Sequence, residues 1–592
     1  MGIALNCLKY SNKVESTEDK STRNVDNDVE TNEESIISKN RHCTDVKYLL
    51  VFSIFLVILI GLLSFCISHG DIDRITNGYD NCINVCGREN TPSSEVPCKG
   101  ENLTSLNYLV VKSANETSSI SRECVASCES VNMKPLLNRC LPKDVKETSE
   151  KFFSKSGFRN FFEEVSEDLD ICWREILYLF ATAFVLSCII VFLLQYIVGI
   201  LVWLVLIGIV IASIIGSIWL WVKSSHVQQS TPDDSEVGVQ RKNSWLIYAI
   251  IGTIITICIC LIIFVMRKRL KLVIQLFREA GKVISSMPLL LFEPFLTFLS
   301  LSITVTLWFY FALWIESSGH IMMESNHTAS LVKDSTMKVT RWYNLLAMFW
   351  FTQFIMGCQH CVIAGAVAAW FYTNNKNQLN HPIFHSFRHL TRYHLGTVAC
   401  GSLIISLVQI IRVMLKAVEY WLRDPQNKVV VFIITCCHCC LGCFENLLQY
   451  LTRNAYIETA IFGQPFCEAG KGAFKLLSNN ALQVFTINSV GDFILFLSKA
   501  FVVFCTVLIG IEVIQHKEGV QHGWVLIVLV GLFAYIVSHC FVSVYEMTID
   551  TIFICFCDDC ERNDGISKPY FMPRGLMEFV QNSKKVLEHS HK

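Results

Sequence analysis

Residues 176–222 read ILYLFATAFVLSCIIVFLLQYIVGILVWLVLIGIVIASIIGSIWLWV, and this run contains no charged side chain. A bilayer core about 30 Å thick is crossed by about 20 helical residues, so the run is long enough for two crossings. Every backbone N–H and C=O in lipid must find a partner within its own segment, which restricts such segments to helices. We therefore predict two transmembrane helices, 175–195 and 199–222, joined by a tight hairpin near Gln195 to Gly199.

Eight further apolar stretches of similar length occur along the chain. They are 48–68, 245–266, 289–314, 344–372, 395–415, 429–449, 492–514 and 523–545. Charged residues make up 17% of the 592 residues, against about 25% in a typical soluble domain. The net charge of −1 gives no basic field that would attract nucleic acid. The predicted fold class is an all-α polytopic membrane protein with ten transmembrane helices, whose surroundings are the lipid bilayer.

Basic residues predict the orientation of these helices. Lys and Arg concentrate in the loops 267–282, 376–392 and 453–475, and all three loops fall on one side of the membrane. Because cytoplasmic loops carry an excess of Lys and Arg, both termini are expected in the cytoplasm. The glycosylation sequons at Asn102, Asn115 and Asn326 then all lie outside. We expect a multi-pass protein of the cell membrane, with organellar membranes as an alternative.

The predicted domains follow from these spans. Residues 1–47 form a disordered cytoplasmic tail, 48–68 the first span, 69–174 an extracellular loop, 175–545 the transport core and 546–592 a second cytoplasmic tail. The extracellular loop holds six cysteines, namely Cys82, Cys86, Cys98, Cys124, Cys128 and Cys140. An even number of cysteines in an oxidising compartment indicates disulfides, whose connectivity stays open among 15 pairings. Zinc binding by the closely spaced pairs is the alternative.

The chain carries no motif typical of hydrolases, kinases or nucleotide-binding proteins, which favours transport over catalysis. We expect no cofactor and no metal. The Cys/His cluster at 436–443 lies within one predicted helix, where consecutive side chains point about 100° apart and cannot all converge on one ion. An ectodomain of this size leaves a receptor or adhesion protein as an alternative class.

Ionisable residues within the predicted spans are functional candidates, because charges in lipid are costly. Glu293, Glu445 and Asp492 are such residues, and each has a structural ion pair as its alternative role. Arg412 lies near the end of its span, where it can reach the interface or pair with Glu419.

The span 344–372 combines amide and aromatic side chains in a pattern suited to an organic cation. A quaternary ammonium has no N–H to donate, so aromatic faces and a nearby carboxylate must replace its hydration. Aromatic residues that merely face lipid would give the same pattern. The candidate substrate-binding residues are Trp350, Phe354, Gln353, Gln359, His360, Glu293, Trp308 and Tyr310.

The second half of the chain carries a series of recognisable segments. They are CQHCVIAGAV at 358–367, RYHLGT at 392–397, QIIR at 409–412, CFE at 443–445, RNAYIETAIFG at 453–463, FC at 466–467, CFCDDCERNDG at 555–565 and KPY at 568–570. Together they resemble the choline transporter-like family, solute carrier family 44. This resemblance implies a ten-span transporter of choline, with ethanolamine as a second candidate, that supplies phospholipid synthesis. Another organic cation or a vitamin phosphate ester such as thiamine pyrophosphate is the alternative substrate.

The segment from Arg453 to Cys467 has helix-breaking residues at Asn454, Gly463 and Pro465. We expect a folded inner loop there. It either gates the cytoplasmic exit or braces the spans on its two sides.

Overall fold

The computed structural model describes most of the chain. The described residues are 41–91, 100–113, 120–128, 133–136, 138–142, 157–230, 236–324, 328–373, 376, 379–421, 428–515, 517, 520, 522–563, 569–578 and 580. Cys98, Asn115 and Asn326 lie outside them, as does most of the N-terminal tail. Predictions for those residues remain predictions.

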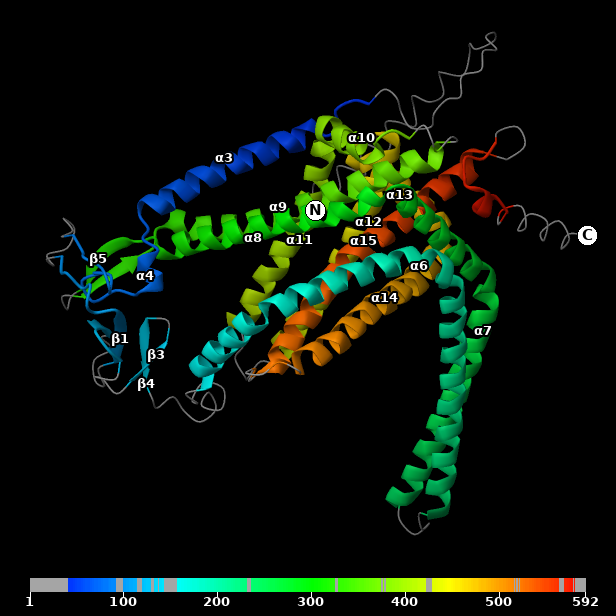
Figure 1. Ribbon diagram of the computed structural model, residues 1–592, viewed down its shortest axis with the longest axis horizontal. Coiled ribbons are helices and arrows are strands. Elements are labelled where there is room, and N and C mark those ends of the chain that lie inside the picture. Colours follow the sequence, from blue (N-terminus) through cyan, green and yellow to red (C-terminus); the bar gives the residue numbers. More distant parts are fainter. Residues whose placement is uncertain are drawn as a thin grey trace, which may run out of the picture.

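Long helices dominate the described chain (Figure 1). The longer helices are α3 (Val46–Ser68), α6 (Gly157–Ser230), α7 (Glu236–Ser286), α8 (Glu293–Ser317), α9 (Ser335–Tyr372), α11 (Leu395–Trp421), α12 (Lys428–Phe462), α14 (Ala481–Gln515) and α15 (Gly523–Arg562). Shorter ones are α4 (Asp73–Thr76), α10 (Pro382–His389) and α13 (Phe466–Asn479). A 3₁₀ turn at Pro288–Phe292 precedes α8, and a π-helical turn at Leu390–His394 links α10 to α11.

Within the described residues, eight helices are long and apolar enough to cross a membrane. Seven of them contain one predicted span each: 48–68, 245–266, 289–314, 344–372, 395–415, 492–514 and 523–545. The eighth, Asp168–Val227, contains both 175–195 and 199–222. The remaining prediction, 429–449, lies in α12, which is helical but is not among the eight. The protein is therefore a polytopic helical membrane protein with eight candidate membrane-spanning helices among its described residues.

The tight hairpin expected near Gln195 to Gly199 is wrong. The structure has one continuous helix there, α6, which bends midway without a break (Figure 1). Helix α6 passes α7 at close range at Gln195, because a Cβ added to Gly281 of α7 would lie 2.3 Å from Cβ of Gln195. A single glycine, Gly199, does not stop a helix whose backbone hydrogen bonds have no water to replace them.

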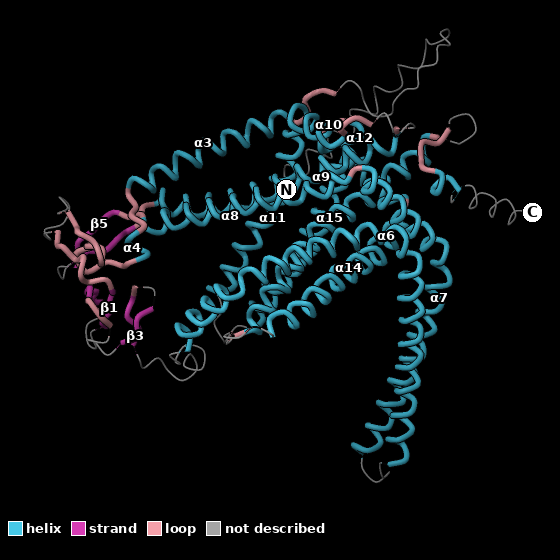
Figure 2. Tube along the Cα trace, viewed as in Figure 1, coloured by secondary structure: helices cyan, strands magenta, loops and turns pink. Residues whose placement is uncertain are grey.

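A small β-rich domain, built mainly from the loop that the sequence predicts to be extracellular, lies at one end of the helical body (Figure 2), and we call it the ectodomain for that predicted position. It contains a four-stranded sheet in the order β2-β1-β4-β3, with β1 at Tyr108–Ser113, β2 at Ile120–Val125, β3 at Met133–Leu136 and β4 at Arg139–Pro142. Disulfides join Cys86 to Cys124 and Cys128 to Cys140. Cys82 is also disulfide-bonded. The cysteines of this domain that the structure describes therefore form disulfides, as predicted, and do not bind zinc as closely spaced pairs.

A hairpin from a distant part of the chain joins this ectodomain. Strands β5 (His320–Glu324) and β6 (Thr328–Val332) pair antiparallel between α8 and α9. Ile321 and Leu331 of the hairpin pack against Ile83 of the first loop. The sequence predicts an ectodomain from the loop 69–174 alone, so the hairpin β5–β6 is an addition that the structure reveals.

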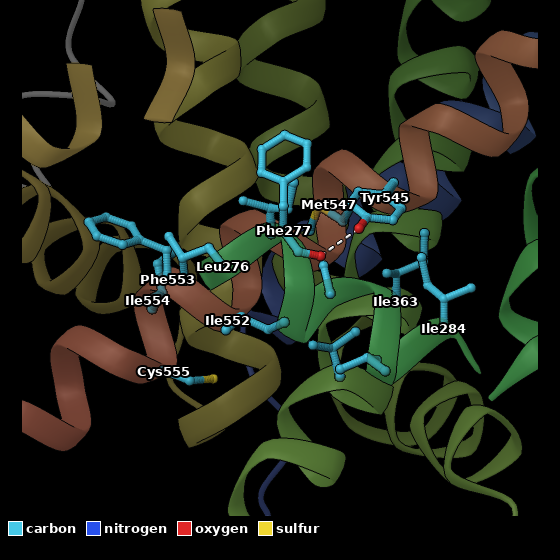
Figure 3. Packing of buried hydrophobic residues seen from close by; sticks show 14 of the residues in the cluster. Leu276, Phe277, Ile284, Ile363, Tyr545, Met547, Ile552, Phe553, Ile554 and Cys555 are labelled. Atoms are coloured by element: carbon cyan, nitrogen blue, oxygen red, sulfur yellow. Dashed lines mark hydrogen bonds between the residues drawn. The ribbon is translucent and has the colours of Figure 1, made fainter. Parts of the chain in front are cut away.

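The largest buried cluster forms where the second half of α7 packs against α15 (Figure 3). Phe277 and Tyr545 lie with ring centroids 5.6 Å apart, and the Tyr545 hydroxyl donates to the Phe277 carbonyl. The basic stretch that follows the span of α7 therefore presents an apolar face to the protein interior. Helix α15 also continues to Arg562, well past residue 545.

The segment that precedes α3 docks on the end of the body opposite the ectodomain. The Thr44 amide donates to the Tyr393 carbonyl at 2.9 Å, and Asp45 Oδ2 accepts from the Phe466 amide at 2.7 Å. Met572 and Leu576, near the end of the described chain, belong to the same buried cluster as α7 and α15. Both ends of the described chain thus lie away from the ectodomain (Figure 1).

Candidate functional site

Helix α9 packs against α3, α8, α11, α12 and α15, and it separates two cavities. One, which we call the central cavity, has a volume of about 620 Å³. Its lining residues are Gln353, Met356, Gly357 and His360 of α9, Ile405 of α11, Asn446, Gln449, Tyr450, Thr452, Arg453 and Tyr456 of α12, Asp492 of α14 and Glu546 of α15.

Helical periodicity explains which α9 residues reach the central cavity. Gln353, Gly357 and His360 are spaced by four and three residues, so they follow one face of the helix. The glycine lets α12 approach this face closely. A Cβ at Gly357 would lie 3.0 Å from the Tyr456 ring and 2.8 Å from Val398. The small residue therefore sets the position of Tyr456 beside the cavity.

The central cavity has a surplus of negative groups. Arg453 lies 2.6 Å from Glu546 and 2.8 Å from Asp550, and Asp492 lines the same space. Two carboxylates thus pair with the guanidinium and a third lines the same cavity, which leaves a formal charge of −2 when all four groups are ionised. Such a surplus attracts a small cation rather than an anion, and the low-dielectric surroundings strengthen the attraction.

Aromatic and polar side chains complete the lining. Tyr450 and Tyr456 supply rings, and the Tyr456 hydroxyl is held by the Val398 carbonyl at 3.2 Å. Gln353, Asn446 and Gln449 supply amide groups that can hold a hydroxyl or water. Carboxylates, rings and amides together form the set of groups that a hydroxylated quaternary ammonium requires.

The other cavity, which we call the lateral cavity, lies on a different face of α9 and has a volume of about 690 Å³. Glu293, Phe354 and Gln359 line it. Its lining also includes Leu296 and Phe384, which are 66% and 68% exposed. These exposed apolar groups would face lipid, so this part of the lateral cavity is less suited to a hydrophilic solute than the central cavity.

The eight candidate residues are therefore not brought together at one site. Gln353 and His360 line the central cavity, whereas Glu293, Phe354 and Gln359 line the lateral cavity. The three others line neither. Trp350 is buried against Phe52 and Phe55 of α3, at ring-centroid distances of 5.0 and 4.8 Å, and its Nε1 donates to the Ala399 carbonyl at 3.3 Å.

Trp308 and Tyr310 lie on α8, away from both cavities. Tyr310 is 47% exposed and its ring lies beside Phe311 and Trp314. This is the arrangement expected of aromatic residues at a lipid-facing helix surface.

Arg453 and Glu546 are not among the candidate residues because the predicted ends of their two helices lie too early in the chain. The sequence predicts Arg453 in an inner loop after residue 449 and Glu546 in the C-terminal tail after residue 545. In the structure α12 runs to Phe462 and α15 to Arg562, so both residues lie inside helices. The signal that could have identified this pair in the sequence is the opposite charge of Arg453 and Glu546 at similar depths in two helices.

Two other ionisable groups form an ion pair outside the central cavity. Arg412 pairs with Glu445, and Gln409 Nε2 donates to Glu445 Oε1 at 3.0 Å. The partner expected for Arg412 was Glu419. Within the described residues, no group of three or more His, Cys, Asp or Glu side chains is placed to hold a metal ion.

Comparison with known proteins gives consistent matches. A family model described as plasma-membrane choline transporter matches residues 250–561. Choline transporter-like protein 1 of Mus musculus is 32% identical over 618 aligned positions, which cover 94% of each chain. Choline transporter-like protein 3 of Homo sapiens is 31% identical over 92% of each chain. Choline transporter-like protein 2 of Dictyostelium discoideum is 28% identical over 91% of this chain and 95% of its own.

Proposed function

Because this chain belongs to the plasma-membrane choline transporter family, we propose that it carries choline across the plasma membrane through the central cavity. The family resemblance drawn from the segments between residues 358 and 570 is confirmed by the matches. The chain carries no motif typical of hydrolases, kinases or nucleotide-binding proteins, which favours a transporter over an enzyme.

The observation that carries the proposal is the excess of carboxylates in a cavity enclosed by α9, α11, α12, α14 and α15. Asp492 and Glu546 provide the negative charge, and an ion pair with Arg453 holds the Glu546 carboxylate in place. The volume of about 620 Å³ leaves room for choline with some of its water. Inward movement of the cation would be driven by the membrane potential, at about 2.3 kcal/mol per charge for each 100 mV.

Ten crossings also belong to this proposal. The apolar part of α6 spans 60 residues, about 90 Å of helix, which is three times the thickness of a bilayer core. Its bend allows each arm to cross once, and the apolar first half of α12 supplies another crossing. The ectodomain would then lie outside, and both termini would lie in the cytoplasm with the basic loops.

Uptake of labelled choline tests the proposal. Cells that display the chain at their surface should take up choline saturably, and cells without it should not. Glu546→Gln should reduce uptake at least tenfold, because the cavity then holds one negative charge fewer next to Arg453. Glu561→Gln is the matched control, since this glutamate lies exposed on the same helix.

Unlabelled ethanolamine should be included as a competitor, because a primary ammonium would use the same carboxylates but gain less from the rings. Absence of choline uptake despite surface display would refute the proposed substrate. Equal uptake by Glu546→Gln and the parent would refute the central cavity as the path.

A further inference from the structure

A small polar pocket, which we call the terminal pocket, lies where the segment before α3 meets α10 and the end of α12. Its volume is about 120 Å³, and its polar lining consists of Arg41, His385, Ser386, His389, His394 and Thr459. Thr459 lies in the family segment 453–463, whose Arg453 and Tyr456 line the central cavity, and His394 lies in the segment 392–397, none of whose residues line that cavity. In place of the first part of the expected inner loop, α12 continues to Phe462, and Gly463 and Pro465 then lie in the short turn before α13.

Arg41 is held in place by hydrogen bonds to the helical body. Its Nη2 donates to the Ala460 carbonyl at 2.7 Å, and its Nη1 lies 3.2 Å from Nε2 of His394. Thr44 fixes the same segment, because its hydroxyl lies 3.0 Å from Nδ1 of His394 and 2.7 Å from the Thr397 hydroxyl. The guanidinium is therefore positioned before any ligand arrives, which lowers the entropy cost of binding.

Two polar groups of the lining have no hydrogen-bond partner within the described part of the chain. They are Nε of Arg41 and the hydroxyl of Thr459, and the Thr459 side chain is fully buried. A buried polar group without a partner costs about 1–3 kcal/mol, so a native protein rarely leaves one without a reason. Both groups can donate a hydrogen bond to a ligand oxygen.

The charge of the lining favours an anion. Arg41 is cationic, three histidines supply ring nitrogens, and the residues that line the pocket include no Asp or Glu. Burial lowers the pKa of Arg41, yet a guanidinium starts from so high a value that it stays protonated. This arrangement differs from the central cavity, where carboxylates outnumber the single arginine.

We propose that the terminal pocket binds a phosphate group, either as inorganic phosphate or as the head of a phosphomonoester. A tetrahedral anion with several acceptor oxygens can engage Arg41, Thr459 and the rings of His385 and His389 at once, while His394 holds Arg41 and Thr44. The small volume suits one phosphate group and excludes a nucleotide base. A bound phosphate would tie the N-terminal segment to α10 and α12, at the end where the described termini lie.

Thermal unfolding of the purified full chain in nanodiscs of zwitterionic lipid tests this proposal. Inorganic phosphate and methyl phosphate are titrated against chloride at matched ionic strength, and a parallel set of nanodiscs contains phosphatidic acid. Phosphate should raise the unfolding temperature saturably. Arg41→Gln and Thr459→Val should weaken the apparent affinity at least about tenfold, because each removes one hydrogen bond to a charged group.

Arg388→Gln is the matched control, since it removes an exposed positive charge from α10 outside the lining and should leave the affinity unchanged. Thr459→Val keeps the side-chain shape and carries the test if Arg41→Gln does not fold. Stabilisation by free phosphate supports a soluble ligand, and stabilisation by phosphatidic acid alone supports a lipid headgroup. No stabilisation by any of the three, or equal stabilisation of the Arg41→Gln and Thr459→Val variants, would overturn the proposal. Failure of choline uptake would not affect it.

Discussion

At the scale of single residues, Arg453 does most to organise the central cavity. It is the one cation among the residues that line this cavity, and it pairs with Glu546 at 2.6 Å and Asp550 at 2.8 Å from a neighbouring helix. Loss of one partner from a buried ion pair leaves the other charge without compensation. The arginine thus has a structural role besides its place beside a substrate.

Arg453→Gln is therefore expected to destabilise the protein by about 3–5 kcal/mol, as for other buried pairs that lose one partner. The double variant Arg453→Gln/Glu546→Gln should recover part of this loss, because it removes one of the uncompensated charges. Choline uptake should stay low in the double variant. Thermal unfolding in detergent and uptake at matched expression measure the two effects. A double variant less stable than Arg453→Gln would contradict the pairing.

Gly357 is expected to be intolerant of even one methyl group. Alanine there would place its Cβ 2.8 Å from Val398 and 3.0 Å from the Tyr456 ring, so α9 and α12 must move apart. Overpacking of this kind costs about 1–3 kcal/mol. Gly357→Ala should therefore lower the unfolding temperature and raise KM for choline. Gly442→Ala, in α12 with open space around it, should change neither.

Sequence periodicity could have separated the candidate residues of α9 before the structure was known. Gln353 and His360 fall on one helical face, and Phe354 and Gln359 on others. Which face holds a cavity with aqueous access depends on the neighbours α12, α14 and α15. No spacing within α9 carries that information, so the choice between Glu293 and the pair Asp492 and Glu546 required the tertiary arrangement.

At the scale of elements, the apolar runs predicted most helix positions well, because a helix that crosses lipid or packs in a protein core needs apolar side chains. Two features were not visible in the composition. Helix α6 bends where a hairpin was predicted, since a continuous helix pairs its own backbone N–H and C=O groups and needs no turn to do so. The extension of α7 beyond its apolar span depends on packing against α15, which a basic, interface-like sequence does not reveal.

This extension of α7 can be tested through Phe277. The side chain is fully buried against Tyr545, so Phe277→Ala should destabilise the protein by about 3–5 kcal/mol. Phe264→Ala is the matched control on the same helix, because Phe264 is 62% exposed and would face lipid. Thermal unfolding in detergent compares the two variants. Similar losses from both would argue that the second half of α7 lies on the membrane surface instead.

At the scale of the whole molecule, two cavities whose linings carry opposite charge lie in different parts of the helical body. The central cavity has surplus carboxylates between α12, α14 and α15, whereas the terminal pocket has an arginine and three histidines near the described termini. A cation and a phosphate group would therefore be recognised separately. Helices α10 and α13, which carry basic residues of the loops predicted to be cytoplasmic, lie away from the β-rich ectodomain (Figure 1), a polarity expected if the ectodomain lies outside.

This polarity leads to a prediction about sidedness. Asn102 is exposed in the ectodomain, and its side-chain oxygen accepts from the Thr104 hydroxyl at 2.8 Å, within its own sequon. If the ectodomain lies outside, Asn102 should carry a glycan, and Asn102→Gln should shift the protein to a lower apparent mass. Asn102→Gln should leave the fold intact, because the side chain fills no core position.

An epitope placed before residue 41 should be reached by antibody only after the cells are made permeable, since the basic loops predict that both termini lie in the cytoplasm. An epitope inserted between residues 92 and 99 of the ectodomain should be reached on intact cells. The reverse pattern would invert the molecule and place the terminal pocket outside. Choline would then enter from the end that carries Arg41, and the phosphate group would have to come from the extracellular medium.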